Sequence, residues 1–267
     1  MRNRPFDAGA VWAFVALGWR RAAAEPAAMV GRLLLYALIL AIFWQLWQAT
    51  PLEELAASGP AAADLLWYVA ITEWIVFAAG NHYRSVEGQI ANGDIERALI
   101  RPVPYAIATL AEWAGTTAFH LLTIGACGVA IATWLTGRIP MAPATVLPLI
   151  LSGALASAIV LLFQLQLGYA AAWMGTSAPL FWIWQKLLFV LGGLLIPLSL
   201  YPEPLRLAAA PGPFAAMLFA PGSLALAPDS QSIAATIGQQ AVWLMLMIVA
   251  TVFVDRAAAA RFADRGS

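Results

Sequence analysis

The chain has 267 residues, of which 62% are hydrophobic and 10% charged, whereas a soluble domain has about a quarter charged residues. Fourteen basic residues balance 14 acidic ones, and the resulting zero net charge argues against nucleic acid as a partner. Cys127 is the one cysteine, which excludes a disulfide framework and a cysteine metal cluster. The composition predicts an integral protein of the lipid bilayer.

Apolar stretches long enough to cross a membrane recur along the whole sequence. A helix needs about 20 apolar residues to cross the hydrocarbon core. The stretches are continuous rather than alternating, which indicates helices and excludes a β-barrel. We therefore predict a single all-α integral membrane domain over residues 1–267, with six transmembrane helices. Their approximate ranges are 30–49, 65–80, 112–136, 145–173, 179–200 and 233–254.

Arginine residues are distributed unevenly between the two sides of these spans. Eleven precede or open the first span, lie between the second and third, or follow the sixth; the other side has Arg138 and Arg206. Basic residues concentrate on the cytoplasmic side of membrane proteins. We therefore expect both termini and segment 81–111 in the cytoplasm. No targeting signal points to an organelle, so we expect the plasma (inner) membrane, and the alanine-rich composition indicates a bacterium. The eleven are Arg2, Arg4, Arg20, Arg21, Arg32, Arg84, Arg97, Arg101, Arg256, Arg261 and Arg265.

The N-terminal segment, residues 1–29, contains a short apolar run ahead of the first span. Val11 and Phe14 recur at helical spacing, and Arg20 and Arg21 close the run. A cleavable signal peptide has a similar pattern, but here the two arginines separate the run from any small-residue cleavage site. We predict an uncleaved amphipathic helix lying at the inner interface.

Segment 201–232 is apolar although it contains six prolines. Its Pro-Gly steps leave pieces that each extend only roughly 10–12 Å as helix. Irregular backbone is not tolerated against lipid, so these pieces must pack on protein or enter the membrane and return. We predict an outer re-entrant helical segment before the last span; a flexible loop would explain the prolines but not the hydrophobicity. The prolines are Pro202, Pro204, Pro211, Pro213, Pro221 and Pro228.

A charged segment, 84–105, separates the second and third spans. Asn92 or Asp94 can cap a short helix there. Ile95 and Leu99 would form a narrow apolar stripe on this helix, between exposed charges. Such a helix suits docking into a groove on a soluble partner. The alternative is a solvated connector between two spans.

This segment and a later one resemble the type 2 ABC-transporter permeases of the six-span bacterial subfamily. The matching stretches read GQIANGDIERALIRPVPY and GGLLIPLSLYPEPLRLAAAPGPFAAMLFAPGSLAL. The resemblance extends over nearly the full length in order and spacing, although the alanine-rich tail departs from the family pattern. The matching residues are Gly93, Ile95, Leu99, Ile100, Arg101, Pro102 and Tyr105, then Ile196, Pro197, Tyr201, Pro202, Pro213 and Phe214.

The resemblance implies a permease subunit of an ATP-driven exporter. Such a permease pairs with a second permease, identical or paralogous, and with two ATPase subunits that bind ATP and Mg²⁺. The segment after the second span would be the coupling helix that contacts the ATPase, and the outer re-entrant helices would help close the pathway. The implied ATPase-coupling residues are Glu87, Gly93, Asp94, Glu96, Arg97, Arg101, Pro102 and Tyr105. The outer residues are Pro197, Pro202, Pro213 and Phe214.

Lys186, the one lysine, is flanked by Gln185 and Leu187. A phosphate-binding P-loop requires a Gly-rich loop that ends in Gly-Lys-Ser/Thr. The chain is therefore no P-loop ATPase, and ATP hydrolysis is expected in a separate partner. We expect no enzymatic activity, cofactor or metal site in this chain.

Polar residues at similar depths in four spans suggest a layer inside the membrane, roughly 10–14 Å from the cytoplasmic ends. Intramembrane ionisable residues are costly and indicate function. Glu73 and Lys186 could form an ion pair within this layer. The layer would line the inner vestibule or join moving helices; a purely structural network is the alternative. Its members are Glu73, His120, Gln164, Gln166 and Lys186.

Three other classes of protein fit the sequence less well. A secondary transporter would have paired broken helices in its two halves, whereas the broken segment occurs once here. An intramembrane enzyme would need a metal or nucleophile motif, and neither an H-E-x-x-H nor a G-x-S-x-G sequence is present. A channel would need a filter sequence. If Phe181, Trp182 and Trp184 line the pathway, they favour an amphipathic or hydrophobic substrate.

Overall fold

The computed structural model describes residues 8–50, 61–95, 103–226 and 230–265. Within these ranges every regular element is a helix, so the predicted all-α membrane fold is confirmed. The elements are α1 (Ala8–Ala23), α2 (Pro26–Ala49), α4 (Ala62–Ala79), α5 (Tyr83–Ala91), α7 (Tyr105–Thr136), α8 (Pro143–Met174), α9 (Ala178–Leu191), η1 (Leu198–Leu200), α10 (Glu203–Ala209), α11 (Pro213–Met217), α12 (Phe219–Ser223) and α13 (Ser230–Arg265).

Five helical stretches in the described ranges are long and apolar enough to cross a membrane. The stretch predicted at 179–200 is different, because its helix α9 has only 14 residues. Its length of about 21 Å is less than the roughly 30 Å of the hydrocarbon core. The helix stops before a turn in which Gly193 has φ +64°, a left-handed conformation that favours glycine. The five are Pro26–Ala49, Ala62–Ala91, Tyr105–Thr136, Pro143–Met174 and Gln231–Phe262.

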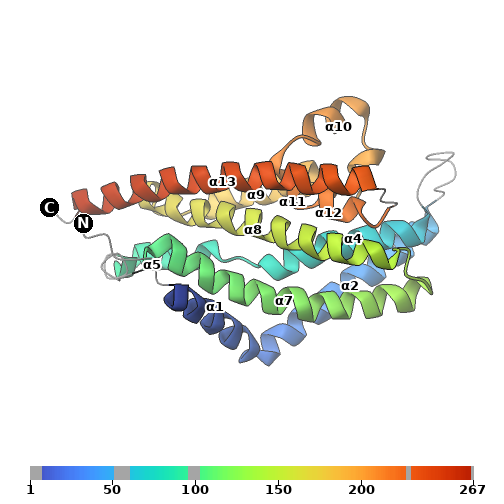
Figure 1. The fold of residues 1–267 in the computed structure, drawn as a ribbon, viewed down its shortest axis with the longest axis horizontal. Helices are drawn as coiled ribbons and strands as arrows, with labels where there is room; N and C mark the ends of the chain where they lie inside the picture. Colours follow the sequence, from blue (N-terminus) through green and yellow to red (C-terminus); the bar gives the residue numbers. More distant parts are fainter. Residues whose placement is uncertain (1–7, 51–60, 96–102, 227–229, 266–267) are drawn as a thin grey trace.

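The long helices lie side by side along the long axis of the molecule (Figure 1). Helix α5 and the C-terminal end of α13 lie at one end of the bundle, called here the α5 end. The connection between α7 and α8 lies at the opposite end, and α10 projects from the side of the bundle near it; we call this the α10 end. The end of α13 and the segment after α4 therefore lie at the same end of the bundle. Their cytoplasmic location stays a prediction.

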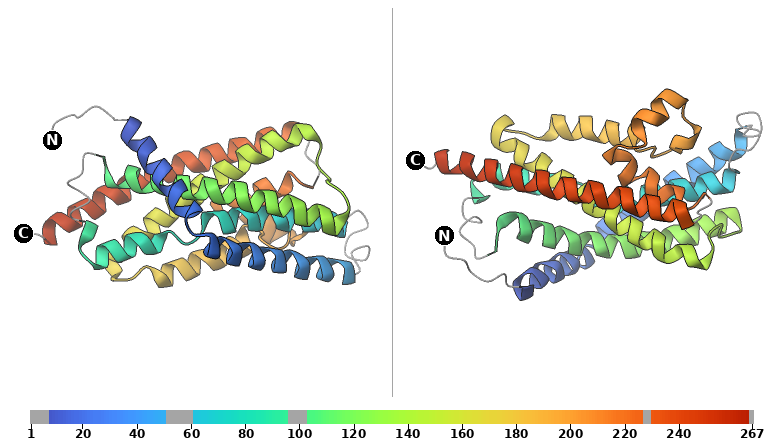
Figure 2. Two further views of the ribbon diagram at one scale, coloured as in Figure 1. Left: turned by 90° about the horizontal axis from the view of Figure 1, so that it is seen from below. Right: turned by 45° about the horizontal axis from the view of Figure 1, so that its top comes forward.

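Helix α1 packs against α7 through two glycines. A Cβ added to Gly18 would lie 1.9 Å from the carbonyl oxygen of Glu112, and one added to Gly115 would lie 1.9 Å from that of Val15. The two backbones are therefore in direct contact, and a larger residue does not fit at either position. Thr116 Oγ1 also donates to the Gly18 carbonyl at 3.2 Å. The predicted N-terminal helix is thus closely packed on the bundle (Figure 2).

The proline-rich segment before α13 forms η1 and the short helices α10, α11 and α12. Ala216 and Met217 of α11 are completely buried, so this part is packed on protein, as the sequence requires. Helix α13 provides hydrogen-bond donors for backbone carbonyls of this segment. Gln240 Nε2 donates to the Ala216 carbonyl at 3.0 Å, and Trp243 Nε1 donates to the Pro211 carbonyl at 2.9 Å. These bonds allow short helices and turns to exist beside the long spans.

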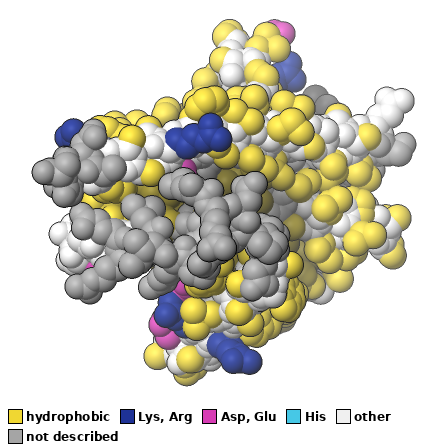
Figure 3. Space-filling view, turned by 60° about the vertical axis from the view of Figure 1, so that its left-hand side comes forward, with side chains coloured by type: hydrophobic (Ala, Val, Ile, Leu, Met, Phe, Trp, Pro, Cys, Tyr) yellow, Lys and Arg dark blue, Asp and Glu magenta, His cyan; other side chains and the backbone are white. Residues whose placement is uncertain are grey.

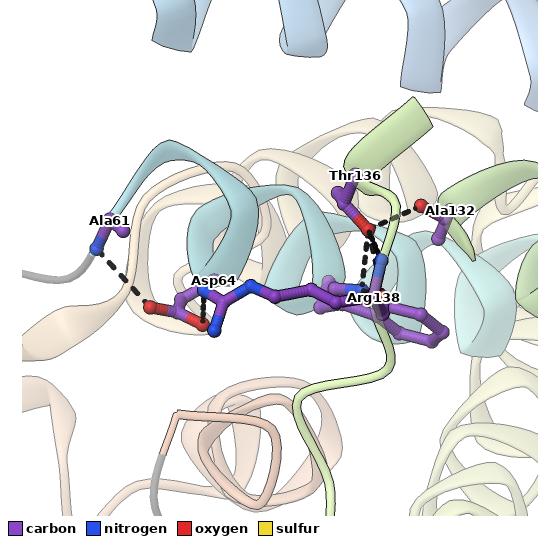
Figure 4. A network of polar contacts seen from close by, with 6 residues as sticks. Ala61, Asp64, Ala132, Thr136 and Arg138 are labelled. Carbon is purple, nitrogen blue, oxygen red and sulfur yellow. Dashed lines mark hydrogen bonds and ion pairs between the residues drawn. The ribbon is translucent and has the colours of Figure 1, made fainter. Parts of the chain in front are cut away.

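At the α10 end, polar contacts join the start of α4 to the end of α7 (Figure 4). Arg138 Nη2 donates to Asp64 Oδ1 at 2.8 Å, and the Ala61 N–H donates to Asp64 Oδ2 at 3.3 Å. Trp67 Nε1 donates to Thr136 Oγ1 at 3.3 Å and to the Arg138 carbonyl at 3.1 Å. The two spans are therefore fixed to each other at this end.

The surface of the bundle is mainly apolar. On the face shown in Figure 3, hydrophobic side chains predominate, and charged side chains occur in a few separate places. Large apolar side chains are exposed along α2, α8 and α13, including Leu38, Leu147 and Phe253. Such a surface is what lipid tails or another membrane helix would cover.

Candidate functional site: the break between α4 and α5

The second membrane-spanning stretch is interrupted between α4 and α5. Helix α4 ends at Ala79, Gly80 has φ +58°, and α5 begins at Tyr83. A break leaves the last carbonyls of one helix and the first N–H groups of the next without their usual partners. In an apolar bundle these groups must find other partners. Side chains of α2, α7 and α8 provide them.

Gln164 on α8 joins the two sides of the break. Its Nε2 donates to the Gly80 carbonyl at 2.8 Å. Its Oε1 accepts the His82 N–H at 2.6 Å and the Tyr83 N–H at 3.3 Å. The side chain is completely buried, so a lost bond would leave a backbone group unpaired in an apolar site. Helix α8 thereby fixes the angle between α4 and α5.

Arg32 on α2 and His120 on α7 reach the last turn of α4. Arg32 Nη1 donates to the Phe77 carbonyl at 2.8 Å. His120 Nδ1 lies 3.3 Å from the Ala78 carbonyl oxygen and 3.4 Å from Arg32 Nη1. Three consecutive spans therefore meet at the C-terminal end of α4, where a cation is favourable to the helix dipole.

Aromatic rings hold the start of α5 against the bundle. The His82 ring stacks on Trp113 of α7, with centroids 5.1 Å apart. The Tyr83 ring stacks on Phe181 of α9, with centroids 4.2 Å apart. The first distance is within the range of favourable offset stacking, and the second is slightly shorter than that range. The first residues of α5 are thus fixed between α7 and α9.

Glu87 connects α5 to the turn between α8 and α9. Thr176 Oγ1 donates to Glu87 Oε1 at 2.7 Å, and Ser177 Oγ donates to Glu87 Oε2 at 2.6 Å. Both carboxylate oxygens are therefore used within the chain. Direct contact of Glu87 with an ATPase stays a prediction, and the structure gives this residue an internal role as well.

Helix α5 ends before the position of the predicted coupling helix, and the chain is helical again at Asp94 and Ile95. The helix runs over Tyr83–Ala91, ahead of the expected cap, and Gly93 follows with φ +71°. Asp94 is exposed. Ile95 is buried in a cluster that includes Tyr105 and Trp113, so the idea that Ile95 docks into a partner's groove is wrong: its own bundle covers it. The predicted residues Glu96, Arg97, Leu99, Ile100, Arg101 and Pro102 lie outside the described residues.

The predicted intramembrane layer divides into separate sites. His120 and Gln164 each contact backbone groups around the break, as described above. Gln166 instead joins α8 to α13, where its Nε2 donates to Thr251 Oγ1 at 3.0 Å. Glu73 is buried on α4, and no ion pair between described residues joins it to Lys186. The predicted pair is therefore wrong, because the lysine lies on the exposed face of α9.

The predicted outer residues occupy the starts of short elements. Pro197 precedes η1, Pro202 precedes α10, and Pro213 is the first residue of α11. Proline suits these positions because it lacks the N–H that a first turn leaves unpaired. The Phe214 ring lies 6.2 Å from that of Phe163 on α8. Whether these residues close a transport pathway stays a prediction.

Several residues of the site did not stand out in the sequence. Arg32 was counted with the loop charges, yet it bonds to a carbonyl of α4. Nothing in the spacing of Thr176 and Ser177 indicates that they bond to Glu87. The dipeptide Gly80-Asn81 at the end of an apolar run was the one local signal for the break. Within the described ranges, no three His, Cys, Asp or Glu side chains are grouped so that they could hold a metal ion.

Comparison with known proteins agrees with this architecture. The family model described as "ABC-2 family transporter protein" matches residues 62–266, from the start of α4 to the end of α13 and beyond. No curated protein and no solved structure matches the chain. The matched range includes the break, the α8–α9 turn and the short helices before α13. The chain therefore belongs to the ABC-2 transporter family, and is a membrane permease of an ABC transporter.

Proposed function

We propose that the chain is the permease subunit of an ATP-driven exporter, and that α5 passes the motion of a separate ATPase to the membrane helices. The observation that carries this proposal is the double attachment of α5. Gln164 bonds to both sides of the break, and Glu87 bonds to the α8–α9 turn. Displacement of α5 would therefore act on α4, α8 and α9 together.

The mechanism uses these attachments. ATP binding closes the ATPase dimer and displaces segment 81–111. Helix α5 and the α8–α9 turn move as one unit, and the permease changes from an inward-open to an outward-open state. ATP can bias this change only if the ATPase binds the two permease states with different affinity.

The partners follow from what the chain lacks and from its family. ATP and Mg²⁺ are held by the ATPase, because no P-loop sequence occurs in this chain. A second permease, identical or paralogous, completes the pathway at the seam between the two copies. The complex resides in the inner membrane with both termini of this chain in the cytoplasm, and it exports an amphipathic or hydrophobic substrate.

Purification of the tagged chain from its native host tests this proposal. We expect mass spectrometry of the material in mild detergent to identify a soluble P-loop ATPase and a permease, and we expect the complex to hydrolyse ATP. A folded chain that purifies alone would contradict the proposal and favour a secondary transporter.

A further inference from the structure

Lys186 lies on the exposed face of α9 without an ionic partner among the described residues. None of the hydrogen bonds or ion pairs between described residues involves it. Its Nζ lies 5.7 Å from the ring centroid of Trp182 and 5.6 Å from that of Phe189. These distances allow cation–π contact, which partly compensates a charge in an apolar place. The ammonium N–H groups remain available to a ligand.

The depth of Lys186 makes a purely lipid-facing role unfavourable. It lies eight residues after Ala178, the first residue of α9, so about 12 Å along the helix. A cation at such a depth normally faces a partner, a cavity or a pathway rather than acyl chains. Helix α9 also lies at an edge of the bundle in both views of Figure 2, where a second subunit or a substrate can reach it.

Other polar groups lie on the neighbouring side of α9, which faces the bundle. A small cleft of about 30 Å³ at the α4–α5 break is lined by Asn81 and Gln185, and it shares Phe189 with the lysine contact. Trp184 lines the same cleft, and its buried indole N–H has no hydrogen-bond acceptor among the described residues. The cleft is too small for a headgroup, and Lys186 is not one of its lining residues, so an anion would bind outside it, on the exposed ammonium group.

The rest of the exposed α9 face is apolar. Trp182, Ile183, Leu187 and Val190 are between 41% and 58% exposed. One cation in an apolar surface matches a molecule with one anionic group and a hydrocarbon chain. Charge complementarity therefore selects the class of ligand, and neither a cationic nor an uncharged amphiphile would use the lysine.

We propose that this face of α9 binds the transported substrate, and that the substrate is an anionic amphiphile whose headgroup contacts Lys186. The hydrocarbon chain lies against Trp182 and Leu187. This inference rests on the proposed export function, which makes the ligand a substrate rather than a resident lipid. The attachment of α9 to α5 through Ser177 places the binding face next to the moving unit.

Dodecyl phosphate is the probe, applied to the intact complex in nanodiscs of zwitterionic phosphatidylcholine. We expect Lys186→Met to raise its Kd about tenfold or more and to abolish its stimulation of ATP hydrolysis, because a charge-assisted contact is lost. Lys186→Arg should stay within about threefold of the original chain, because the charge is kept. Dodecylphosphocholine should bind all variants equally. Arg206→Met removes an exposed cation from α10 and should change neither quantity.

Equal Kd values for the original chain and Lys186→Met would overturn the inference. It would also be overturned if phosphatidylglycerol displaced the probe and ATP hydrolysis did not respond, since the site would then hold a resident lipid. Size-exclusion profiles confirm folding of each variant. Absence of a co-purifying ATPase would contradict the proposed function instead. Mass spectrometry of the purified complex detects that absence, whereas the Kd tests only the substrate site.

Discussion

The Ser177 hydroxyl donates a hydrogen bond of 2.6 Å to the Glu87 carboxylate, and so joins the turn before α9 to α5. Ser177 is completely buried, and Thr176 adds a second bond of 2.7 Å to the other carboxylate oxygen. The two helices thus share a contact that is independent of the backbone connection through α7 and α8. This contact makes α5 part of the membrane bundle.

Glu87→Ala removes both of these bonds. We expect it to lower stability by about 1–2 kcal/mol, because hydrogen bonds to a charged group are strong but this carboxylate is partly solvated. ATP hydrolysis of the complex should lose part of its response to substrate. Thermal inactivation and ATPase assays measure the two effects. Glu203→Ala, at an exposed carboxylate on α10, is the control. If both variants behave alike, the attachment has no mechanical role.

Gln164→Leu preserves the approximate volume of the side chain but removes its bonds to Gly80, His82 and Tyr83. Three backbone groups then lack this partner, so we expect a loss of about 2–4 kcal/mol. Gln166→Leu on the same helix is the matched comparison and should cost about 1 kcal/mol. Thermal unfolding in a single detergent gives the ranking. A larger loss for Gln166→Leu would contradict the assignment of the break as the more critical site.

Gly115→Ala tests the contact between α1 and α7. Its added methyl group would lie 1.9 Å from the Val15 carbonyl oxygen, so the helices must separate. We expect a loss of at least about 2 kcal/mol and increased proteolysis within α1. Gly31→Ala is the control, because nothing lies within 4 Å of the added atom there. That variant should be neutral or more stable by up to about 1 kcal/mol. Equal stability of the two variants would disprove the close contact.

Asp64→Asn should have a small effect. The ion pair with Arg138 is partly exposed, and pairs of this kind contribute about 0–1 kcal/mol. Trp67→Phe should cost more, because it removes the N–H that donates to Thr136 and to the Arg138 carbonyl from a buried ring. Thermal unfolding at low and high salt separates the two, since the ion pair responds to salt. A larger, salt-independent loss for Asp64→Asn would contradict this ranking.

Much of the fold could be predicted from the sequence, because continuous apolar runs have few structures available in a membrane. Three predicted spans match helices within four residues, and two more lie inside longer helices. The proline-rich segment before α13 is buried on protein, as its hydrophobicity required. The 179–200 span was extended too far. The sequence stays apolar past Leu191, but the left-handed conformation at Gly193 follows the end of the helix. A hydropathy pattern does not reveal such a turn.

The site was less predictable, since depth along a span does not determine the direction in which a side chain points. The sequence places His120 and Gln164 at one level, and both contact backbone groups around the α4–α5 break, His120 at Ala78 and Gln164 at Gly80. Glu73 and Lys186 were placed at the same level, yet one is buried and the other is exposed on α9. The hydrogen bond from Arg32 to the Phe77 carbonyl could not be predicted, because the spacing of residues does not show which side chains reach a backbone carbonyl.

The central claim is that α5 and the α8–α9 turn move as one unit during ATP hydrolysis. The direct measurement uses Glu87→Cys with Ser177→Cys in a Cys127→Ser background, with a short thiol-specific reagent joining the two positions in the intact complex. We predict that the reduced double variant responds weakly to substrate, and that cross-linking restores the ATPase response because it replaces the lost bonds. A cross-link that lowers ATP hydrolysis further, with recovery on reduction, would contradict the claim by showing that the two elements must move apart.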